Sequence, residues 1–172
     1  MISAKLQKAI NNQIQAEMYS ANLYLAMSGQ CMSKNLKGFA NWLRVQYQEE
    51  TMHALKFVDY ILERGGELNL QQIDALPAEF GKPVEIFEKI LAHEQHVTDL
   101  INKLYEVAVA EKDVAAQIFL QWFVTEQVEE EASASEVLEQ LRMIGDENSG
   151  LFYLDKELAA RTYQPPAADA KA

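Results

Sequence analysis

The chain has 172 residues, of which 49% are hydrophobic and 24% charged, so it holds enough apolar material for the core of one globular domain. This composition argues against a disordered chain, and seven glycines with four prolines leave long stretches that favour helices over the frequent turns of an all-β fold. The net charge of -11 repels phosphate backbones, so we expect no nucleic acid partner and a preference for cations.

Cysteine usage and the first residues indicate the compartment. Cys31 is the single cysteine and cannot form an internal disulfide. The first residues lead into amphipathic sequence without an apolar signal segment, and no apolar run approaches the ~20 residues of a membrane span. We therefore expect a protein of the reducing cytoplasm that does not insert into a membrane.

Apolar residues at three- and four-residue spacing predict two long helices in the first half of the chain. The first covers about residues 3–31, with Ser3 as its N-cap. The second covers about residues 36–64 and ends at Gly65 and Gly66. The pattern predicts no strand in this half.

The second half of the chain continues the pattern. A third long helix is predicted with Pro83 in its first turn, and a fourth carries the apolar stripe of residues 119–144. A short fifth helix, capped by Asp146, carries the apolar positions of residues 151–158. Two consecutive prolines then begin a small-residue tail, residues 165–172, which we expect to be disordered.

The connections between the helices predict the topology. The first two helices, and likewise the third and fourth, are joined by only a few residues, so each pair forms an antiparallel hairpin. Residues 65–82 differ, because a helix of ~28 residues is ~42 Å long and these 18 residues reach ~59 Å when extended. We therefore predict an all-α four-helix bundle with a long crossover between the second and third helices. The apolar residues by which the crossover is expected to pack, for example on another subunit, are Leu68, Leu70, Ile73, Leu76 and Phe80.

Each long helix places carboxylates on its apolar face when its residues are set at 100° intervals. Glu50 shares an arc with Phe57 and Ile61 on the second helix. His53 follows three residues later and projects from the adjoining part of that face. The other inward acids are Glu17 on the first helix, Glu94 on the third, and Glu126 and Glu130 on the fourth.

These inward acids predict a metal site. A buried carboxylate is costly unless it is paired or binds metal, and the same stripes carry no matching set of Lys or Arg. Carboxylates with one imidazole suit iron or manganese. Glu50 can bridge two ions while His53 ligates one. The residues that close the site from the other helices are Glu17, Glu94 and Glu130.

The pattern resembles ferritin-like di-metal bundles, which have a Glu on each of two helices and Glu-x-x-His on the other two. Here Gln127-x-x-Glu130 replaces the second Glu-x-x-His, so one histidine serves the whole centre. This asymmetry resembles the bacterial non-haem ferritins and identifies residues 1–164 as a ferritin-like di-iron domain. The matching residues are Glu17, Tyr24, Glu49, Glu50, His53, Glu94, Glu126, Gln127, Glu129 and Glu130.

The resemblance implies a ferroxidase that oxidises Fe(II) with dioxygen and stores ferric oxyhydroxide mineral inside a shell of twenty-four copies. Gln127 would lie beside the iron pair, and Tyr24 would hydrogen-bond near it or donate an electron, with Trp122 as a second donor. By this resemblance one iron binds Glu17, Glu50 and His53, a second binds Glu50, Glu94 and Glu130, and a third site nearby uses Glu49, Glu126, Glu129 and Glu130.

Three other functions stay open at this point. A haem-containing bacterioferritin would have a methionine directly after the bridging Glu, whereas Thr51 holds that position and Met52 follows it, so we expect no haem. A di-iron oxidoreductase acting on an organic substrate would have a lined pocket and often the second histidine. A metal-free helical interaction module would bind no Fe(II) and would gain no thermal stability from metal.

Overall fold

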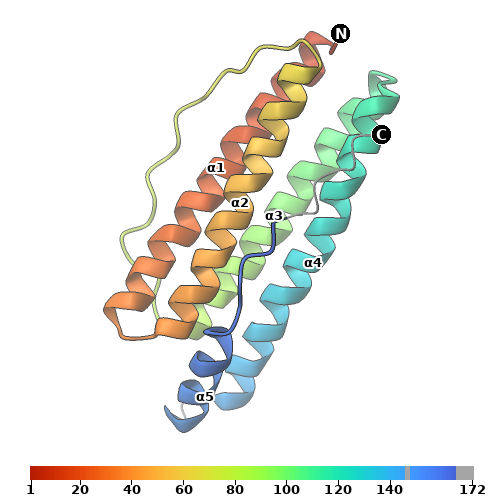
Figure 1. Ribbon diagram of the computed structural model, residues 1–172. Helices are drawn as coiled ribbons and strands as arrows, with labels where there is room; N and C mark the ends of the chain where they lie inside the picture. Colours follow the sequence, from red (N-terminus) through yellow and green to blue (C-terminus); the bar gives the residue numbers. More distant parts are fainter. Residues whose placement is uncertain (146–147, 166–172) are drawn as a thin grey trace.

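The chain folds into a bundle of four long helices with a short fifth helix at one end (Figure 1). The computed structural model describes residues 1–145 and 148–165, and these residues contain no strand. The predicted all-α four-helix bundle is therefore confirmed. The helices are α1 (Ala4–Ser33), α2 (Lys37–Glu63), α3 (Pro83–Ala110), α4 (Val114–Ile144) and α5 (Asn148–Leu158).

The helices begin at residues that suit a helix start. Ser3 Oγ accepts a hydrogen bond from Leu6 N at 3.2 Å, so the predicted N-cap of α1 is confirmed. Asp113 caps α4 in the same way through Ala116 N at 3.0 Å. Pro83 occupies the first turn of α3, as predicted. Because Asp113 caps α4, this helix begins at Val114, before the apolar stripe of residues 119–144 from which it was predicted.

The turns that end three of the helices use left-handed backbone. Asn35 has a φ of 61° between α1 and α2, and Lys112 has a φ of 56° between α3 and α4. Gly65 follows α2 with a φ of 68°, a conformation that glycine adopts without a Cβ clash. The predicted stop of α2 at this glycine is therefore confirmed.

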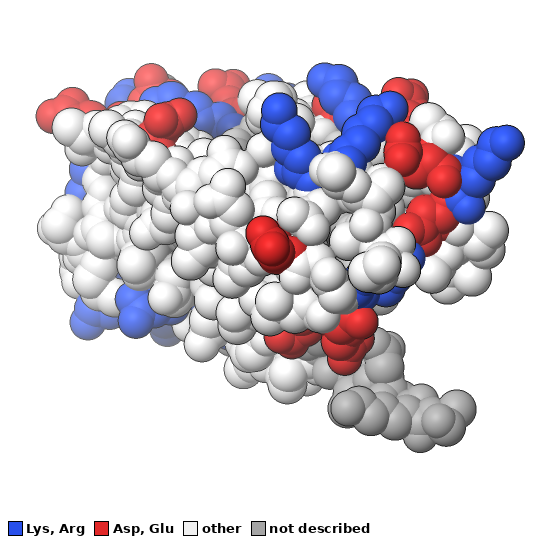
Figure 2. All heavy atoms as spheres, turned by 90° about the horizontal axis from the view of Figure 1, so that it is seen from above, with Lys and Arg blue, Asp and Glu red and all other residues white. Residues whose placement is uncertain are grey.

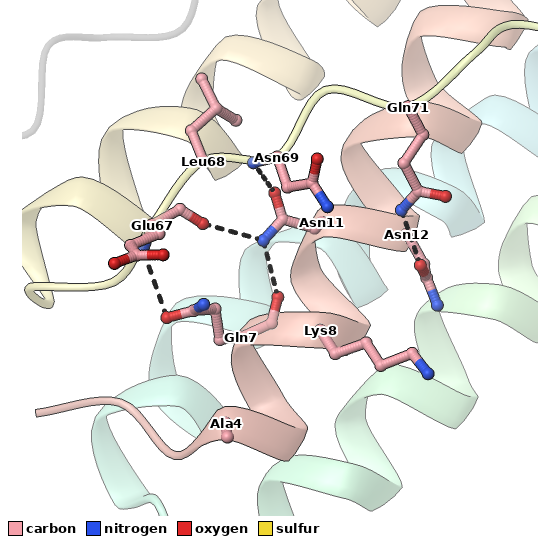
Figure 3. A pocket seen from close by; sticks show the side chains of 9 residues that line it. All are labelled: Ala4, Gln7, Lys8, Asn11, Asn12, Glu67, Leu68, Asn69 and Gln71. Carbon is pink, nitrogen blue, oxygen red and sulfur yellow. Dashed lines mark hydrogen bonds between the residues drawn. The ribbon is translucent and has the colours of Figure 1, made fainter.

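The crossover, residues 64–82, runs the length of the bundle along α1 and sets α2 and α3 parallel, as its length predicted (Figure 1). Side-chain amides of α1 hold its first residues. Asn11 Nδ2 donates to Glu67 O at 3.0 Å, and Asn11 Oδ1 accepts from Asn69 N at 2.7 Å (Figure 3). These bonds satisfy the backbone of a segment that has no helix or sheet partner.

The apolar side chains of the crossover divide into two groups. Phe80 is 2% exposed in the core, and Leu76 packs against the same cluster, so the predicted packing is confirmed there. Leu68, Leu70 and Ile73 are 37% to 65% exposed. The crossover therefore joins the core at its end near α3 and leaves apolar side chains uncovered near its beginning and middle.

A polar layer separates two apolar clusters in the core. One cluster includes Phe39 and Phe87 and extends to α5. The other includes Ile10 and Phe57 and lies toward the start of α1. The buried polar side chains of the helices are Asn11, Gln13, Glu17, Ser20, Ser28, Gln46, Glu50, His53, Glu94, Gln127 and Glu130.

Helix α5 completes the start of α2. Leu36 precedes α2 without a side-chain cap, and Asp155 Oδ1 instead accepts hydrogen bonds from Gly38 N at 2.8 Å and Phe39 N at 3.0 Å. A Cβ on Gly38 would lie 1.5 Å from the Asp155 carbonyl oxygen, so only glycine permits this approach. The C-terminal helix is thereby fixed to the bundle by a specific contact.

Two sequence predictions lie outside the described residues: the cap at Asp146 and the tail beyond Pro165. The extent of the predicted domain, residues 1–164, stays a prediction. Within the described part of the chain, every helix is too short or too polar to serve as a membrane span.

Candidate metal centre

Five predicted ligands meet in the polar layer at the middle of the bundle. Glu17, Glu50, His53 and Glu94 are each 1% exposed, and Glu130 is 6% exposed. All four long helices contribute, because each ligand lies on the apolar face of its helix. Glu50 Oε2 and His53 Nδ1 are 3.5 Å apart, as three-residue spacing on one helix allows.

Neutral side-chain amides orient two of these carboxylates. Gln13 Nε2 donates to Glu17 Oε1 at 2.8 Å, and Gln46 Nε2 donates to Glu130 Oε2 at 2.7 Å. Both bonds are buried. Because the donors are neutral, they orient the two carboxylates without cancelling their charge.

Glu94 accepts hydrogen bonds on both carboxylate oxygens. The Tyr24 hydroxyl donates to Glu94 Oε1, and Gln127 Nε2 lies 3.3 Å from Glu94 Oε2 and donates to it. The same amide also donates to the Glu94 carbonyl oxygen at 3.3 Å. The structure therefore places Tyr24 and Gln127 directly against one predicted iron ligand.

Several buried polar atoms of this layer have no hydrogen-bond partner among the described residues. They are Glu17 Oε2, Gln46 Oε1, Glu50 Oε2 and His53 Nε2. A buried polar group without a partner costs about 1–3 kcal/mol, and more when it is charged. Carboxylate oxygens and imidazole nitrogens are ligands that iron accepts. The unpaired atoms are thus chemically suited to a metal ion.

Burial controls the protonation of the cluster. It raises the pKa of Glu17, and with nearby carboxylates it raises the pKa of Glu50 and Glu130 well above the usual range. Burial also raises the pKa of Glu94 to about 7. Burial lowers the pKa of His53 to about 3, so its imidazole is neutral at physiological pH and has a lone pair for a metal.

Two groups of three side chains bring ligand atoms within 4.8 Å of one another. Glu17, Glu50 and His53 form the first, which is the set predicted for one iron. His53 forms the second together with Glu126 and Glu130, two residues predicted for the third site. His53 therefore lies between two clusters of acids.

The set predicted for the second iron is less closely assembled. Glu50, Glu94 and Glu130 lie near enough for Glu94 to raise the pKa of the other two, but they do not form a group within that distance. The oxygens of Glu94 face Tyr24 and Gln127 instead. Each of these oxygens keeps a second lone pair that a metal could use, and this ligand role stays a prediction.

Comparison with known proteins identifies the family. Residues 7–144 match the ferritin-like domain family. The chain belongs to the ferritins. It is 48% identical to the bacterial non-heme ferritin of Bacteroides fragilis over 161 residues, which cover 94% of this chain and 100% of the relative. It is 40% identical to the bacterial non-heme ferritin of Staphylococcus haemolyticus over 163 residues, which cover 95% of this chain and 98% of the relative.

Solved ferritin structures also match this ferritin over nearly its whole length. An engineered closed form of the Archaeoglobus fulgidus ferritin has a TM-score of 0.94 and 50% identity, and covers 95% of this chain and 100% of its own. An open pore ferritin from the same archaeon has a TM-score of 0.92 and 51% identity, and covers 94% and 100%. The predicted resemblance to bacterial non-haem ferritins is therefore confirmed.

The remaining predicted ligands of this ferritin lie closer to the surface. The Glu49 side chain is 18% exposed, and its Oε2 accepts from Arg161 Nη2 at 2.7 Å. The Glu126 side chain is 27% exposed, with Oε1 4.0 Å from His53 Nε2. Glu129 is exposed one turn after Glu126 and belongs to neither group. The residues predicted for the third site are therefore only partly brought together.

Trp122 packs against the histidine of the centre. Its ring lies edge-on to that of His53, with 5.4 Å between centroids, and Lys56 Nζ lies 4.7 Å from the Trp122 ring centroid. Trp122 thus fixes the orientation of His53 from the side of α4. Its predicted role as an electron donor stays a prediction.

Sequence reasoning missed three residues around the centre. Gln13 precedes Glu17 by four residues and Gln46 precedes Glu50 by four, so helical spacing already placed both amides on inward faces. That spacing was the available signal. Arg161 follows the last helix and has no periodic pattern to place it.

The surface charge differs from that of the centre. Seen from the end of the bundle that holds the α3–α4 turn, acidic and basic side chains are interspersed around the rim (Figure 2). No single acidic patch covers the described part of this face. Among the described residues, the four buried glutamates are therefore clustered without the basic side chains that accompany the acids on that face.

Proposed function

We propose that this ferritin stores iron by oxidising Fe(II) with dioxygen at the buried centre and depositing ferric oxyhydroxide inside a shell of twenty-four copies in the cytoplasm. The buried atoms of Glu17, Glu50 and His53 that lack hydrogen-bond partners are the observation that carries the proposal. Relatives named non-heme ferritins support iron as the metal and favour a centre without haem.

The proposed ligand sets follow the family resemblance. The di-iron domain is residues 1–164, and residues 165–172 are its tail. The close approach of Glu17, Glu50 and His53 supports the first set, and that of Glu126 and Glu130 supports part of the third. The three sets are Glu17, Glu50 and His53; Glu50, Glu94 and Glu130; and Glu49, Glu126, Glu129 and Glu130.

The centre has the chemistry that oxidation of Fe(II) requires. Each Fe(II) loses one electron, and dioxygen accepts it. Oxygen ligands stabilise Fe(III) over Fe(II), and the carboxylates offset the growing positive charge. Neutral His53 binds without first losing a proton. The amides of Gln13, Gln46 and Gln127 hold the carboxylates in a fixed orientation, as supporting groups of metal sites do.

Self-association is supported by apolar side chains that the bundle leaves uncovered. They lie on the crossover, on α4 and on α5, so more than one side of the subunit can bury apolar area against other copies. The most exposed of them on these elements are Leu70, Val114, Ile118, Val128, Met143, Phe152 and Tyr153.

Aerobic addition of Fe(II) to the metal-free protein tests the proposal. We expect a particle of several hundred kilodaltons that retains far more iron than its ligand residues can bind, with a ferric absorbance and no Soret band. Iron counting after gel filtration measures the retained iron, and the elution volume measures the size. Glu63→Gln, an exposed change on α2, serves as a control that should store iron normally.

Other outcomes distinguish the other functions. Retention of about two irons per chain, with no large particle, would indicate a di-iron oxidoreductase that acts on another substrate. Absence of both Fe(II) binding and metal-dependent thermal stabilisation would indicate a helical interaction module. A Soret band would indicate a bacterioferritin.

A further inference from the structure

Arg161 is held at the edge of the centre by the chain that follows α5. Asn41 Nδ2 donates to Leu158 O at 3.2 Å and to Arg161 O at 2.9 Å, which fixes the backbone of this segment against α2. The Arg161 guanidinium carbon lies 4.5 Å from the Trp42 ring centroid. The side chain is therefore positioned by its backbone and by a cation–π contact.

From this position Arg161 contacts an acid of the proposed third site. Arg161 Nη2 donates to Glu49 Oε2 at 2.7 Å, and the two side chains are only 24% and 18% exposed. Arg161 Nη1 is buried and has no hydrogen-bond partner among the described residues. Burial raises the pKa of Glu49 and, together with nearby carboxylates, that of Glu130, and Arg161 offsets part of each rise. The guanidinium thus faces the same acids that a third ion would face.

We propose that Arg161 is a tethered cation that competes with metal for Glu49, so that the third site binds metal more weakly while the guanidinium contacts this carboxylate. The proposal rests on the proposed function, since it concerns a ligand of the same centre. It predicts that the third site is weaker than the other two because one of its acids is already paired.

Three physical reasons support competition. A guanidinium stays charged at every physiological pH, so the pair does not release Glu49 by titration. The short tether keeps the guanidinium at high effective concentration beside Glu49. An ion bound at Glu126 and Glu130 would repel the guanidinium, because like charges in a partly buried site interact strongly.

The first and third sites differ in whether an arginine already neutralises one of their acids. Glu17 and Glu50 have no arginine contact among the described residues, and each keeps one oxygen without a hydrogen-bond partner. A metal there displaces no cation from them. At Glu49 the metal meets a carboxylate that already has a cation on its Oε2, so it gains less from the same negative charge.

Calorimetric titration of the metal-free full chain with Zn(II), which dioxygen does not oxidise, tests the proposal. For the wild type we expect two tight equivalents per chain and a weaker third. Arg161→Gln should tighten the third by about tenfold and leave the first two within about twofold. Arg161→Lys, which keeps a charge but loses the fork geometry, should tighten it by a smaller factor.

Two variants provide the controls. Glu49→Gln should lose the third equivalent, and adding Arg161→Gln to it should change nothing further. Arg142→Gln should behave as wild type, because this exposed arginine pairs with Glu139 at 2.7 Å and Glu88 at 3.4 Å on the surface. Circular dichroism and gel filtration check that each variant folds, and the lysine variant provides the same test if Arg161→Gln does not.

The inference and the proposed function fail in different ways. A third affinity unchanged in both Arg161 variants would overturn the inference while the two tight equivalents remained. Tightening that persists with Glu49→Gln, or absence of a third equivalent in every variant, would overturn it too. Loss of the two tight equivalents in the wild type would instead overturn the proposed function.

Discussion

The inner and outer carboxylates of this ferritin are held by different kinds of donor. Glu130, in the polar layer, accepts from the neutral amide of Gln46 at 2.7 Å. Glu49, at the edge of the layer, accepts at the same distance from the charged guanidinium of Arg161. The two hydrogen bonds have the same length, but only the one to Glu49 brings a positive charge to its carboxylate.

The difference shows that the two carboxylates are compensated in different ways. An amide orients a carboxylate but leaves its negative charge buried, which remains unfavourable until a cation arrives or a proton binds. An arginine supplies the cation itself. The inner acids therefore have no cation beside them among the described residues of the metal-free protein and retain protons instead, whereas Glu49 has Arg161 as a counter-charge.

The largest expected effect comes from removing the central inner acid. Glu50→Gln should weaken Zn(II) and Fe(II) binding by more than about 100-fold, the upper range for groups that only support metal ligands. The same change should stabilise the metal-free protein at neutral pH by about 1–4 kcal/mol, because it removes an acid that folding forces either to take up a proton or to carry a buried charge. Calorimetry and thermal unfolding measure the two effects.

Weaker metal binding together with higher stability of the metal-free protein would identify Glu50 as a metal ligand and not as a structural residue. Glu63→Gln on the exposed part of α2 should change neither quantity. Loss of stability together with loss of binding would show that Glu50 supports the fold instead.

The pH dependence of stability should be the next largest effect. Because burial raises the pKa of Glu94 to about 7 and, with nearby carboxylates, that of Glu50 well above its usual range, the folded state binds more protons than the unfolded state at near-neutral pH. The stability of the metal-free protein should therefore fall as pH rises, by about 1.4 kcal/mol per pH unit for each group still protonated. His53, with a pKa lowered from 6.5 to about 3, acts oppositely only below its ordinary pKa.

Urea unfolding between pH 7.5 and 8.5 separates the carboxylates from the opposing histidines, because His53 and His93 are largely deprotonated in both the folded and the unfolded state there. Saturating Zn(II) should replace the bound protons and flatten the profile. A metal-free profile that rises with pH in this window would contradict the buried-charge description of the inner acids.

A smaller effect is expected from the neutral donors. Gln46→Leu removes the bond to Glu130 and should weaken metal binding by about tenfold, as loss of a supporting hydrogen bond does. Gln48→Leu, an exposed change on the same helix, is the matched control. Equal affinities in the two variants would mean that Gln46 only fills space.

The smallest effect is expected from Tyr24→Phe. This change removes the hydroxyl that donates to Glu94, so metal affinity should fall by about threefold, within the range of a single hydrogen bond. Stopped-flow oxidation of Fe(II) tests the electron-donor role separately, with exposed Tyr153→Phe as control. An unchanged rate with unchanged intermediates would exclude a tyrosyl step.

Most of what the sequence predicted about the centre came from the spacing of residues along single helices. The inward position of Glu17 and the pairing of Glu50 with His53 follow from 3.6 residues per turn, so they could be predicted without a structure. The inward position of Gln13 could be predicted in the same way. Its side chain is neutral, however, so its burial does not point to a metal site as the burial of a carboxylate does. The prediction therefore found the buried charges and missed a neutral group that orients them.

Contacts between distant parts of the chain could not be predicted in the same way. Arg161 reaches Glu49 across 112 residues, and no periodicity relates the two positions. The hydrogen bonds on Glu94 likewise depend on how α3 packs against α1 and α4. Helical phase, by contrast, already predicted the inward position of Glu130, which is buried while its neighbour Glu129 is exposed.

The contact between Asp155 and Gly38 has a consequence for synthesis on the ribosome. The carboxylate that caps α2 is translated 117 residues after the amide that it binds. A nascent chain that has not yet reached Asp155 therefore has the first turn of α2 without this acceptor. A chain terminated before residue 155 would keep these two backbone amides without the hydrogen bonds that they make in the folded protein.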